Sequence, residues 1–155
     1  MKLNFLKNKS ILITGGTGSI GAGLVNKLIK TNCKVIRILS NDENGLYELS
    51  KKLNLSLLAF DNFSKDMKKN KFRFFLGDIR DSIRCQEITK NVDIVIHAAA
   101  LKHVSIVEYN PEEGFKTNFI GTKNIISAAI KNKVSKFLFI STDKVVSARN
   151  TMGKT

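Results

Sequence analysis

Three glycines recur at every third position near the N-terminus, at Gly15, Gly18 and Gly21. They follow a short apolar run that stops at Thr14, and a helical pattern begins directly behind them. Glycine has no Cβ, so the backbone can adopt a positive φ and a ligand can approach it closely. Because the first amide groups of a helix are unpaired and lie at the positive end of its dipole, this pattern predicts a cradle for a pyrophosphate.

A second set of residues that could do chemistry lies near the other end of the chain, at Thr142, Asp143 and Lys144. A carboxylic acid beside an amine can exchange acid and base roles, and a lysine becomes a base when burial or nearby cations lower its pKa. The alternative interpretation is a helix or loop N-cap followed by a solvated lysine. We expect no metal site, because a strand-to-loop break separates His97 from His103 and no carboxylate or cysteine joins them.

The elements that must position these residues alternate along the chain. Runs of Val, Ile, Leu and Phe bounded by turn residues predict strands, and apolar residues at helical spacing predict helices between them. The segment Asn54–Asn70 has no clear assignment. The expected strands are 11–14, 35–39, 72–76, 93–97 and 136–141, and the expected helices are 19–30, a segment containing Leu46, Leu49 and Leu53, 81–89 and 111–132.

The last of these helices is the longest. Pro111 suits its first turn, where the missing N–H of proline would be unpaired anyway. Four apolar side chains follow at helical spacing, and we expect this stripe to face the core. The stripe consists of Phe115, Phe119, Ile126 and Ile130.

Strands that are almost continuously apolar and alternate with helices predict a parallel sheet covered on both faces. Right-handed crossovers then give a doubly wound α/β sheet, for which we expect the strand order 3-2-1-4-5. Ligands of such sheets bind at the carboxyl ends of the strands, where the order reverses. Gly15–Gly21, Asp78, Ala98–Ala100 and Ser141–Lys144 all follow strand ends, so we expect these segments to converge on one crevice.

Length and composition are typical of one globular domain. The 155 residues are 43% hydrophobic and 25% charged, and no apolar run reaches the roughly 18–20 residues that a membrane-spanning helix requires. Two cysteines imply no disulfide framework, and we expect a cytoplasmic location. The net charge is +13, but the lysines are scattered and form no dense basic arm. We therefore expect anionic nucleotide ligands and no nucleic acid as partner.

Three segments together resemble the extended short-chain dehydrogenase/reductase family. Residues 14–21 resemble its nucleotide fingerprint, Gly77–Asp81 its adenine-contacting segment, and Ala98–Ala100 the small-residue lining beside the nicotinamide ribose. The alternative for each segment alone is tight packing at a strand end. Their occurrence in this order implies an NAD(P)-binding Rossmann fold.

The same resemblance assigns roles to individual residues. Asn118 is implied to steady the central helix and an active-site water, and Lys102 to contact substrate or cofactor, with a solvated lysine as the alternative. The implied cofactor-binding residues are Gly15, Thr17, Gly18, Ser19, Ile20, Gly21, Ser40, Asn41, Asp78, Ile79, Ala98, Ala99, Ala100, Lys102, Asn118 and Ser141.

Two longer segments narrow the resemblance. Residues 97–126 and 139–153 are similar to the branch of inverting UDP-N-acetylglucosamine 4,6-dehydratases. The resemblance implies that NADP removes hydride from C4 of a UDP-sugar and returns it to C6 after the C6 hydroxyl has left. In this scheme Lys144 removes the C5 proton, Asp143 protonates the leaving hydroxyl and Thr142 hydrogen-bonds the C4 oxygen. Return of the proton to the opposite face inverts C5.

The chain departs from the wider family in three places. Met152 stands where the family has a catalytic tyrosine, and a thioether cannot transfer a proton usefully. The same methionine occurs in a sub-branch that resembles capsule and O-antigen enzymes. The lysine that accompanies the tyrosine falls at position 156, beyond the sequence. The phosphate-reading arginine after the second strand is missing, but Ser40 can bond a 2′-phosphate, which favours NADP over NAD.

Extended family members continue through a further substrate-binding domain. We therefore expect this chain to be an N-terminal fragment, with residues 1–155 as the cofactor-binding domain, that binds a nucleotide without turning over. A full-length form is expected to be a homo-oligomer that takes a UDP-sugar. Two alternatives stay open, a UDP-glucose-type 4-epimerase and a non-catalytic NAD(P)-binding module.

Overall fold

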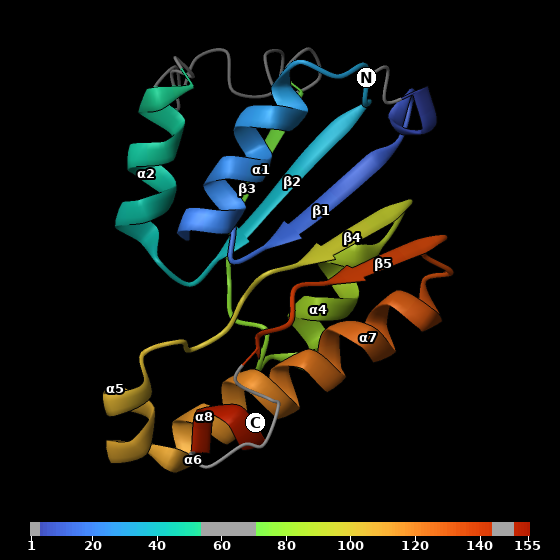
Figure 1. The fold of residues 1–155 in the computed structure, drawn as a ribbon. Coiled ribbons are helices and arrows are strands. Elements are labelled where there is room, and N and C mark those ends of the chain that lie inside the picture. Colours follow the sequence, from blue (N-terminus) through green and yellow to red (C-terminus); the bar gives the residue numbers. More distant parts are fainter. Residues whose placement is uncertain (1–3, 54–70, 144–150) are drawn as a thin grey trace.

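The centre of the computed structural model is a five-stranded parallel sheet (Figure 1). The structure describes residues 4–53, 71–143 and 151–155. Across the sheet the order is β3-β2-β1-β4-β5, which confirms the predicted doubly wound topology. The strands are β1 (Ser10–Thr14), β2 (Val35–Ser40), β3 (Phe72–Leu76), β4 (Ile94–His97) and β5 (Lys136–Phe139).

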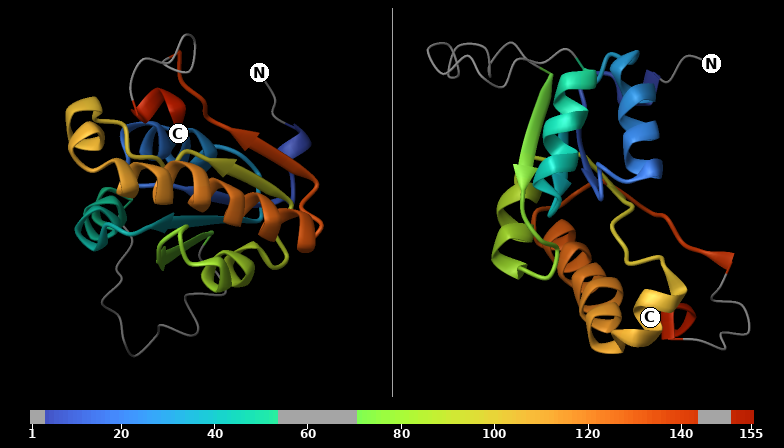
Figure 2. Two further views of the ribbon diagram at one scale, coloured as in Figure 1. Left: turned by 90° about the horizontal axis from the view of Figure 1, so that it is seen from below. Right: turned by 90° about the vertical axis from the view of Figure 1, so that its left-hand side faces the viewer.

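Helices cover both faces of the sheet (Figures 1 and 2). Helices α1 (Ser19–Ile29) and α2 (Glu43–Lys52) pack on one face, while α4 (Ser82–Thr89) and α7 (Thr122–Lys131) pack on the other. Successive side chains of a strand point to opposite faces. Ile11 and Ile13 of β1 therefore lie in the core beneath α1 and α2, whereas Leu12 lies in the core beneath α4 and α7.

Aspartates fix the starts of two of these helices. The Asp42 carboxylate accepts a hydrogen bond from Gly45 N at the start of α2, at 2.9 Å. Asp81 likewise accepts from Ile83 N and Arg84 N at the start of α4, each at 2.9 Å. Such caps satisfy amide groups that have no partner within the helix. The start predicted at residue 81 is therefore confirmed as a cap.

The helix predicted from Pro111 onward consists of three connected parts. It begins as α6 (Pro111–Gly114), continues as the π-helical segment Phe115–Gly121 and ends as α7. π-helical turns inside α-helices are rare overall, and those that occur are often found at functional sites. The short helices α5 (Val104–Tyr109) and α8 (Thr151–Lys154) lie beside its first part (Figure 1).

The prediction that large apolar side chains of this helix face the core is wrong. The exposed fractions are 47% for Phe115, 50% for Phe119, 39% for Ile126 and 74% for Ile130. The buried face is formed mainly by small residues, which allow the helix to approach the sheet and α4 closely. It consists of Gly121, Ile125, Ala128 and Ala129.

Two remaining features concern the limits of the described chain. The unassigned segment Asn54–Asn70 lies outside the described residues. Among the helices that are described, none combines the length and the apolar character that crossing a bilayer would take.

Candidate functional site

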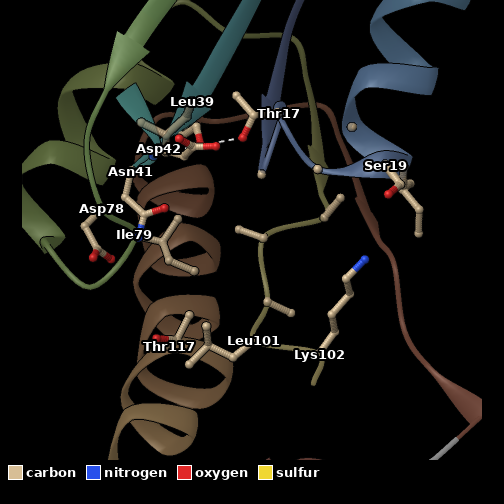
Figure 3. Close-up of a pocket in the computed structure, with 18 of the residues that line it drawn as sticks. Thr17, Ser19, Leu39, Asn41, Asp42, Asp78, Ile79, Leu101, Lys102 and Thr117 are labelled. Carbon is tan, nitrogen blue, oxygen red and sulfur yellow. Dashed lines mark hydrogen bonds between the residues drawn. The ribbon is translucent and has the colours of Figure 1, made fainter. Parts of the chain in front are cut away.

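A pocket opens at the carboxyl ends of β1, β2, β3 and β4, where the turns that follow these strands face one another (Figure 3). It brings together all but two of the residues for which cofactor contacts were predicted. Asn118 and Ser141 are the two that do not line it. The predicted residues in its wall are Gly15, Thr17, Gly18, Ser19, Ile20, Gly21, Ser40, Asn41, Asp78, Ile79, Ala98, Ala99, Ala100 and Lys102.

The glycine loop, residues 15–21, forms the floor of the pocket between β1 and α1. Gly15 has a φ of +66°, and a Cβ there would lie 2.7 Å from the Ala99 backbone. A Cβ at Gly21 would overlap the Gly15 carbonyl oxygen. The loop passes so close to the β4 turn and to the first turn of α1 that neither position has room for a side chain, which is why glycine is required there.

The start of α1 leaves its amide groups available to a ligand. Gly18 is the N-cap residue and supplies no side-chain hydrogen bond to them. The helix has no acidic residue in its first turn. Unpaired amides at the positive end of a helix dipole favour an anionic group such as a phosphate. Ile20, one of the residues implied to bind cofactor, is 55% exposed and lines the pocket.

Hydroxyl groups join the glycine loop to the end of β2. Thr17 Oγ1 and Ser40 Oγ lie 2.8 Å apart, and Ser40 Oγ also accepts from Asp42 N at 3.1 Å. Ser40 is 6% exposed. The Asp42 side chain lines the pocket while it caps α2 (Figure 3). The hydroxyl of Ser40 is therefore used within the chain, and a carboxylate occupies the neighbouring wall.

The β3 turn, residues 77–80, forms the adjacent wall. The Asp78 carboxylate accepts from Arg80 N at 2.8 Å and forms an ion pair with Arg80 Nη2 at 2.7 Å. Burial opposes ionisation of Asp78, but its hydrogen bonds with Arg80 and Asn41 outweigh burial and hold its pKa below the usual value. Arg80 also pairs with Glu113 at 2.6 Å. Asp78 is thus held as an anion in a fixed turn.

The β4 turn, residues 98–102, closes the opposite side. Asn118 holds it from the π-helical segment, because its Oδ1 accepts from Leu101 N at 2.8 Å and its Nδ2 donates to Leu101 O at 3.1 Å. The same Nδ2 lies 3.3 Å from Thr155 Oγ1. Lys102 extends across the pocket toward the end at which Ser19 lies (Figure 3). Asn118 therefore shapes the wall without lining it, and Lys102 places a cationic side chain in the wall.

A buried histidine connects β1, β4 and α7 beneath these turns. His97 Nδ1 lies 2.6 Å from Thr14 Oγ1, and its Nε2 lies 2.9 Å from Thr122 Oγ1. Burial lowers the pKa of His97 to about 4. His97 thus packs at the end of its strand, and the neutral ring holds together the two strand ends from which the glycine loop and the β4 turn depart.

Of the residues predicted to be catalytic, Thr142 and Asp143 are described and do not line this pocket. Ser141, Thr142 and Asp143 follow β5 and are exposed, and Thr142 Oγ1 donates to Asp143 Oδ1 at 3.2 Å. Lys144 lies outside the described residues, and Met152 belongs to α8. Their catalytic roles stay predictions. The part of the chain that is described contains no group of His, Cys, Asp and Glu side chains suited to a metal ion.

Several residues of the site were not foreseen from the sequence. Asp42 and Leu101 each lie one residue beyond a predicted contact, so the strand-end rule applied one position further could have found them. Thr14, Thr122 and Asn124 act beneath the wall, and their spacing offers no comparable signal. The further unforeseen lining residues are Leu39 and Thr117, whereas Gly77 begins the segment predicted to contact adenine.

A parallel sheet with a glycine loop after β1 and a pocket at the point of strand-order reversal defines a Rossmann-type fold. Solved structures share it. Pen from Bacillus thuringiensis has a TM-score of 0.86 at 37% identity, over 97% of this chain and 43% of that one. A UDP-glucose 4-epimerase from Stenotrophomonas maltophila with bound NAD has a TM-score of 0.75 at 21% identity, over 94% and 45%. The second likeness concerns the fold alone.

Residues 11–155 match the family described as Polysaccharide biosynthesis protein, and the chain belongs to that family. It is 49% identical to an uncharacterized membrane protein of Methanocaldococcus jannaschii, over 98% of this chain and 41% of the relative. It is 42% identical to an inverting UDP-N-acetylglucosamine 4,6-dehydratase of Campylobacter jejuni, over 95% and 40%. It is 39% identical to a UDP-glucose 4-epimerase of Rickettsia typhi, over 94% and 40%. The chain thus spans about 40% of the length of these curated relatives.

Proposed function

We propose that this chain is the nicotinamide-dinucleotide-binding part of an enzyme that modifies nucleotide sugars. The observation that carries the proposal is the pocket, in which the glycine loop, the uncapped start of α1 and the turns after β2, β3 and β4 surround one groove. These parts fit a dinucleotide. The amides of α1 suit its pyrophosphate, and the half-buried, ionised Asp78 can accept a hydrogen bond from an adenine amino group.

The choice between NADP and NAD depends on the turn after β2. The sequence favoured NADP because Ser40 could bond a 2′-phosphate, but Ser40 already bonds Thr17 and Asp42. The Asp42 carboxylate in the wall would repel a phosphate and can accept from a ribose 2′-hydroxyl. We therefore propose that the pocket accepts NAD at least as well as NADP.

The reaction that we propose is 4,6-dehydration of UDP-N-acetylglucosamine with inversion at C5. The bound dinucleotide supplies a hydride acceptor and donor. Thr142 hydrogen-bonds the C4 oxygen, Lys144 removes the C5 proton, and Asp143 in its protonated form delivers a proton to the leaving C6 hydroxyl. Met152 cannot transfer a proton, so Lys144 or Asp143 also serves as base for oxidation at C4. The family and the 42% identity to an inverting dehydratase support this assignment.

Two alternatives have specific support. Relatives named UDP-glucose 4-epimerase are 39% identical, and a 4-epimerase would use the same cofactor pocket. We favour dehydration because epimerisation at C4 needs no acid and base for C5 and C6. A product lighter than the substrate by one water indicates dehydration, whereas a product of unchanged mass indicates epimerisation. The other alternative is a non-catalytic NAD(P)-binding module. Met152 supports it, because this residue stands where the family has a catalytic tyrosine and cannot transfer a proton.

Gly21→Ala should weaken dinucleotide binding strongly, because the new Cβ would overlap the Gly15 carbonyl oxygen and displace the glycine loop. Isothermal titration of the 155-residue chain with NAD and with NADP measures the effect, and we expect at least a tenfold loss of affinity, which is about 1.4 kcal/mol.

Gly23→Ala is the matched control, because it lies in the same helix and its Cβ would meet nothing within 4 Å. This variant should bind as the unaltered chain does. Equal affinities of the Gly21→Ala and Gly23→Ala variants, with both folded, would contradict the proposed cofactor site.

A further inference from the structure

We propose that Asn124 is a positioning residue of the cofactor pocket, which holds the β3 turn in the shape that receives the adenine half of the dinucleotide. This inference rests on the proposed function. Asn124 lies on α7 and does not line the pocket. It acts through Asp78 and Ile79, which do (Figure 3).

The amide of Asn124 uses both of its hydrogens on the β3 turn. Its Nδ2 donates to Ile79 O at 3.1 Å and to Arg80 O at 2.9 Å. A side-chain amide has two N–H donors, so the two bonds use all that this nitrogen offers. Two successive carbonyl groups are thereby directed toward α7, which fixes the orientation of the backbone directly after Asp78.

Packing brings the β3 turn close enough for these bonds. Ile79 is 4% exposed, and a Cβ at Gly121 would lie 2.6 Å from two of its side-chain atoms. Gly121 is the last residue of the π-helical segment, three positions before Asn124. The absence of a side chain at Gly121 therefore lets Ile79 rest on the helix, and Asn124 then reaches the two carbonyl groups that flank the Cα of Arg80.

Fixing the backbone of the β3 turn also fixes the position of the Asp78 carboxylate. Asp78 accepts from Arg80 N at 2.8 Å and from Arg80 Nε at 2.8 Å, so its orientation depends on where Arg80 lies. Asn124 holds the carbonyl of Arg80 from the other side. Loss of the Asn124 amide would free the β3 turn to rotate, and Asp78 would lose its fixed position in the pocket wall.

The chain offers a close match for Asn124 that has no connection to the pocket. Asn132 is the C-cap residue of α7, and its Nδ2 donates to Gln86 O at 2.9 Å and to Thr89 Oγ1 at 2.7 Å. These bonds join α7 to α4, and neither acceptor lines the pocket. Asn132→Ala therefore removes the same number of hydrogen bonds from the same helix without touching the β3 turn.

The test compares the affinities of the unaltered 155-residue chain, Asn124→Ala and Asn132→Ala for adenosine 5′-monophosphate and for nicotinamide mononucleotide. We expect Asn124→Ala to bind adenosine monophosphate about tenfold more weakly and nicotinamide mononucleotide unchanged. Asn132→Ala should bind both as the unaltered chain does. Asn124→Ser keeps one donor and should give an intermediate affinity, which also serves if Asn124→Ala does not fold.

Equal affinities of folded Asn124→Ala and Asn132→Ala for adenosine monophosphate overturn the inference and leave the proposed function standing. An equal loss for both half-ligands in Asn124→Ala also overturns it, because the effect would then be general destabilisation. If the unaltered chain binds neither adenosine monophosphate nor NAD, the proposed function fails and this inference fails with it.

Discussion

The imidazole of His97 is fully buried, lies between the hydroxyls of Thr14 and Thr122 and stacks on Phe139 at 5.6 Å. In the neutral ring one nitrogen donates a hydrogen bond and the other accepts one. Protonation would make both nitrogens donors, so one threonine hydroxyl would have to reorient, and burial disfavours the charged ring. The pKa of His97 is therefore lowered to about 4. A residue that the sequence placed simply in a strand end is thus a pH-sensitive tie between two strands and a helix.

Acid should weaken the fold through His97. The unfolded chain binds a proton near pH 6.5 and the folded chain only near pH 4, so stability falls as the pH drops from about 6.5 to 4. The expected loss is on the order of 3 kcal/mol. Urea unfolding at a series of pH values measures it.

His97→Gln keeps an amide that can bond both threonines but cannot titrate, so its stability should change less over this range. The pKa values of Asp78, Asp93 and Glu113 are lowered in the folded chain. Their contribution to the stability of the fold is therefore lost mainly below about pH 4.5. An identical pH slope in His97→Gln and the unaltered chain would exclude His97 as the cause.

The helix that begins at Pro111 is the element that joins most parts of the site. Asn118 holds the β4 turn, Thr122 holds His97, and Asn124 holds the β3 turn. A π-helical segment separates its first turn from α7. Because this helix presents polar groups to the pocket walls and small residues to the core, its large apolar residues are left facing solvent.

The buried face of this helix should be sensitive to added volume, and its exposed face should not. Ala128 is 1% exposed, so Ala128→Leu overfills the core beneath α7 and should cost about 1–3 kcal/mol. Ile130 is 74% exposed, so Ile130→Lys should change stability by no more than about 0.5 kcal/mol. Denaturant unfolding gives both values, and the reverse order would restore the predicted stripe as the core face.

At the scale of the whole molecule, the residues that we propose to act on the sugar follow a different strand from the residues that line the described pocket. The pocket lies at the ends of β1 to β4, whereas Thr142 and Asp143 are exposed beyond β5. The chain spans about 40% of the length of its curated relatives.

We therefore predict that the 155-residue chain binds NAD or NADP but does not convert UDP-N-acetylglucosamine. Incubation with substrate and cofactor followed by mass spectrometry should show unchanged substrate. A 4-keto product lighter by one water would contradict this expectation, and the Gly21→Ala variant then shows whether that activity depends on the pocket.

The topology and the cofactor pocket could be predicted because they depend on local patterns. Apolar strand segments, turn residues and the spacing of Gly15, Gly18 and Gly21 indicate the elements, and right-handed crossovers leave little choice of strand order. Residues that follow strand ends must then meet at one edge of the sheet. The sequence by itself therefore determined the sheet, its order and most of the pocket wall.

Tertiary structure alone decided which face of the helix after Pro111 is buried and which groups act beneath the wall. A stripe of large residues and a stripe of small ones lie at equivalent helical spacing, and only the distance between helix and sheet selects the small one. Likewise the partners of His97, Asn118 and Asn124 come from segments distant in the chain. Long-range contacts of this kind leave no periodic signal in a single sequence, so packing decided them.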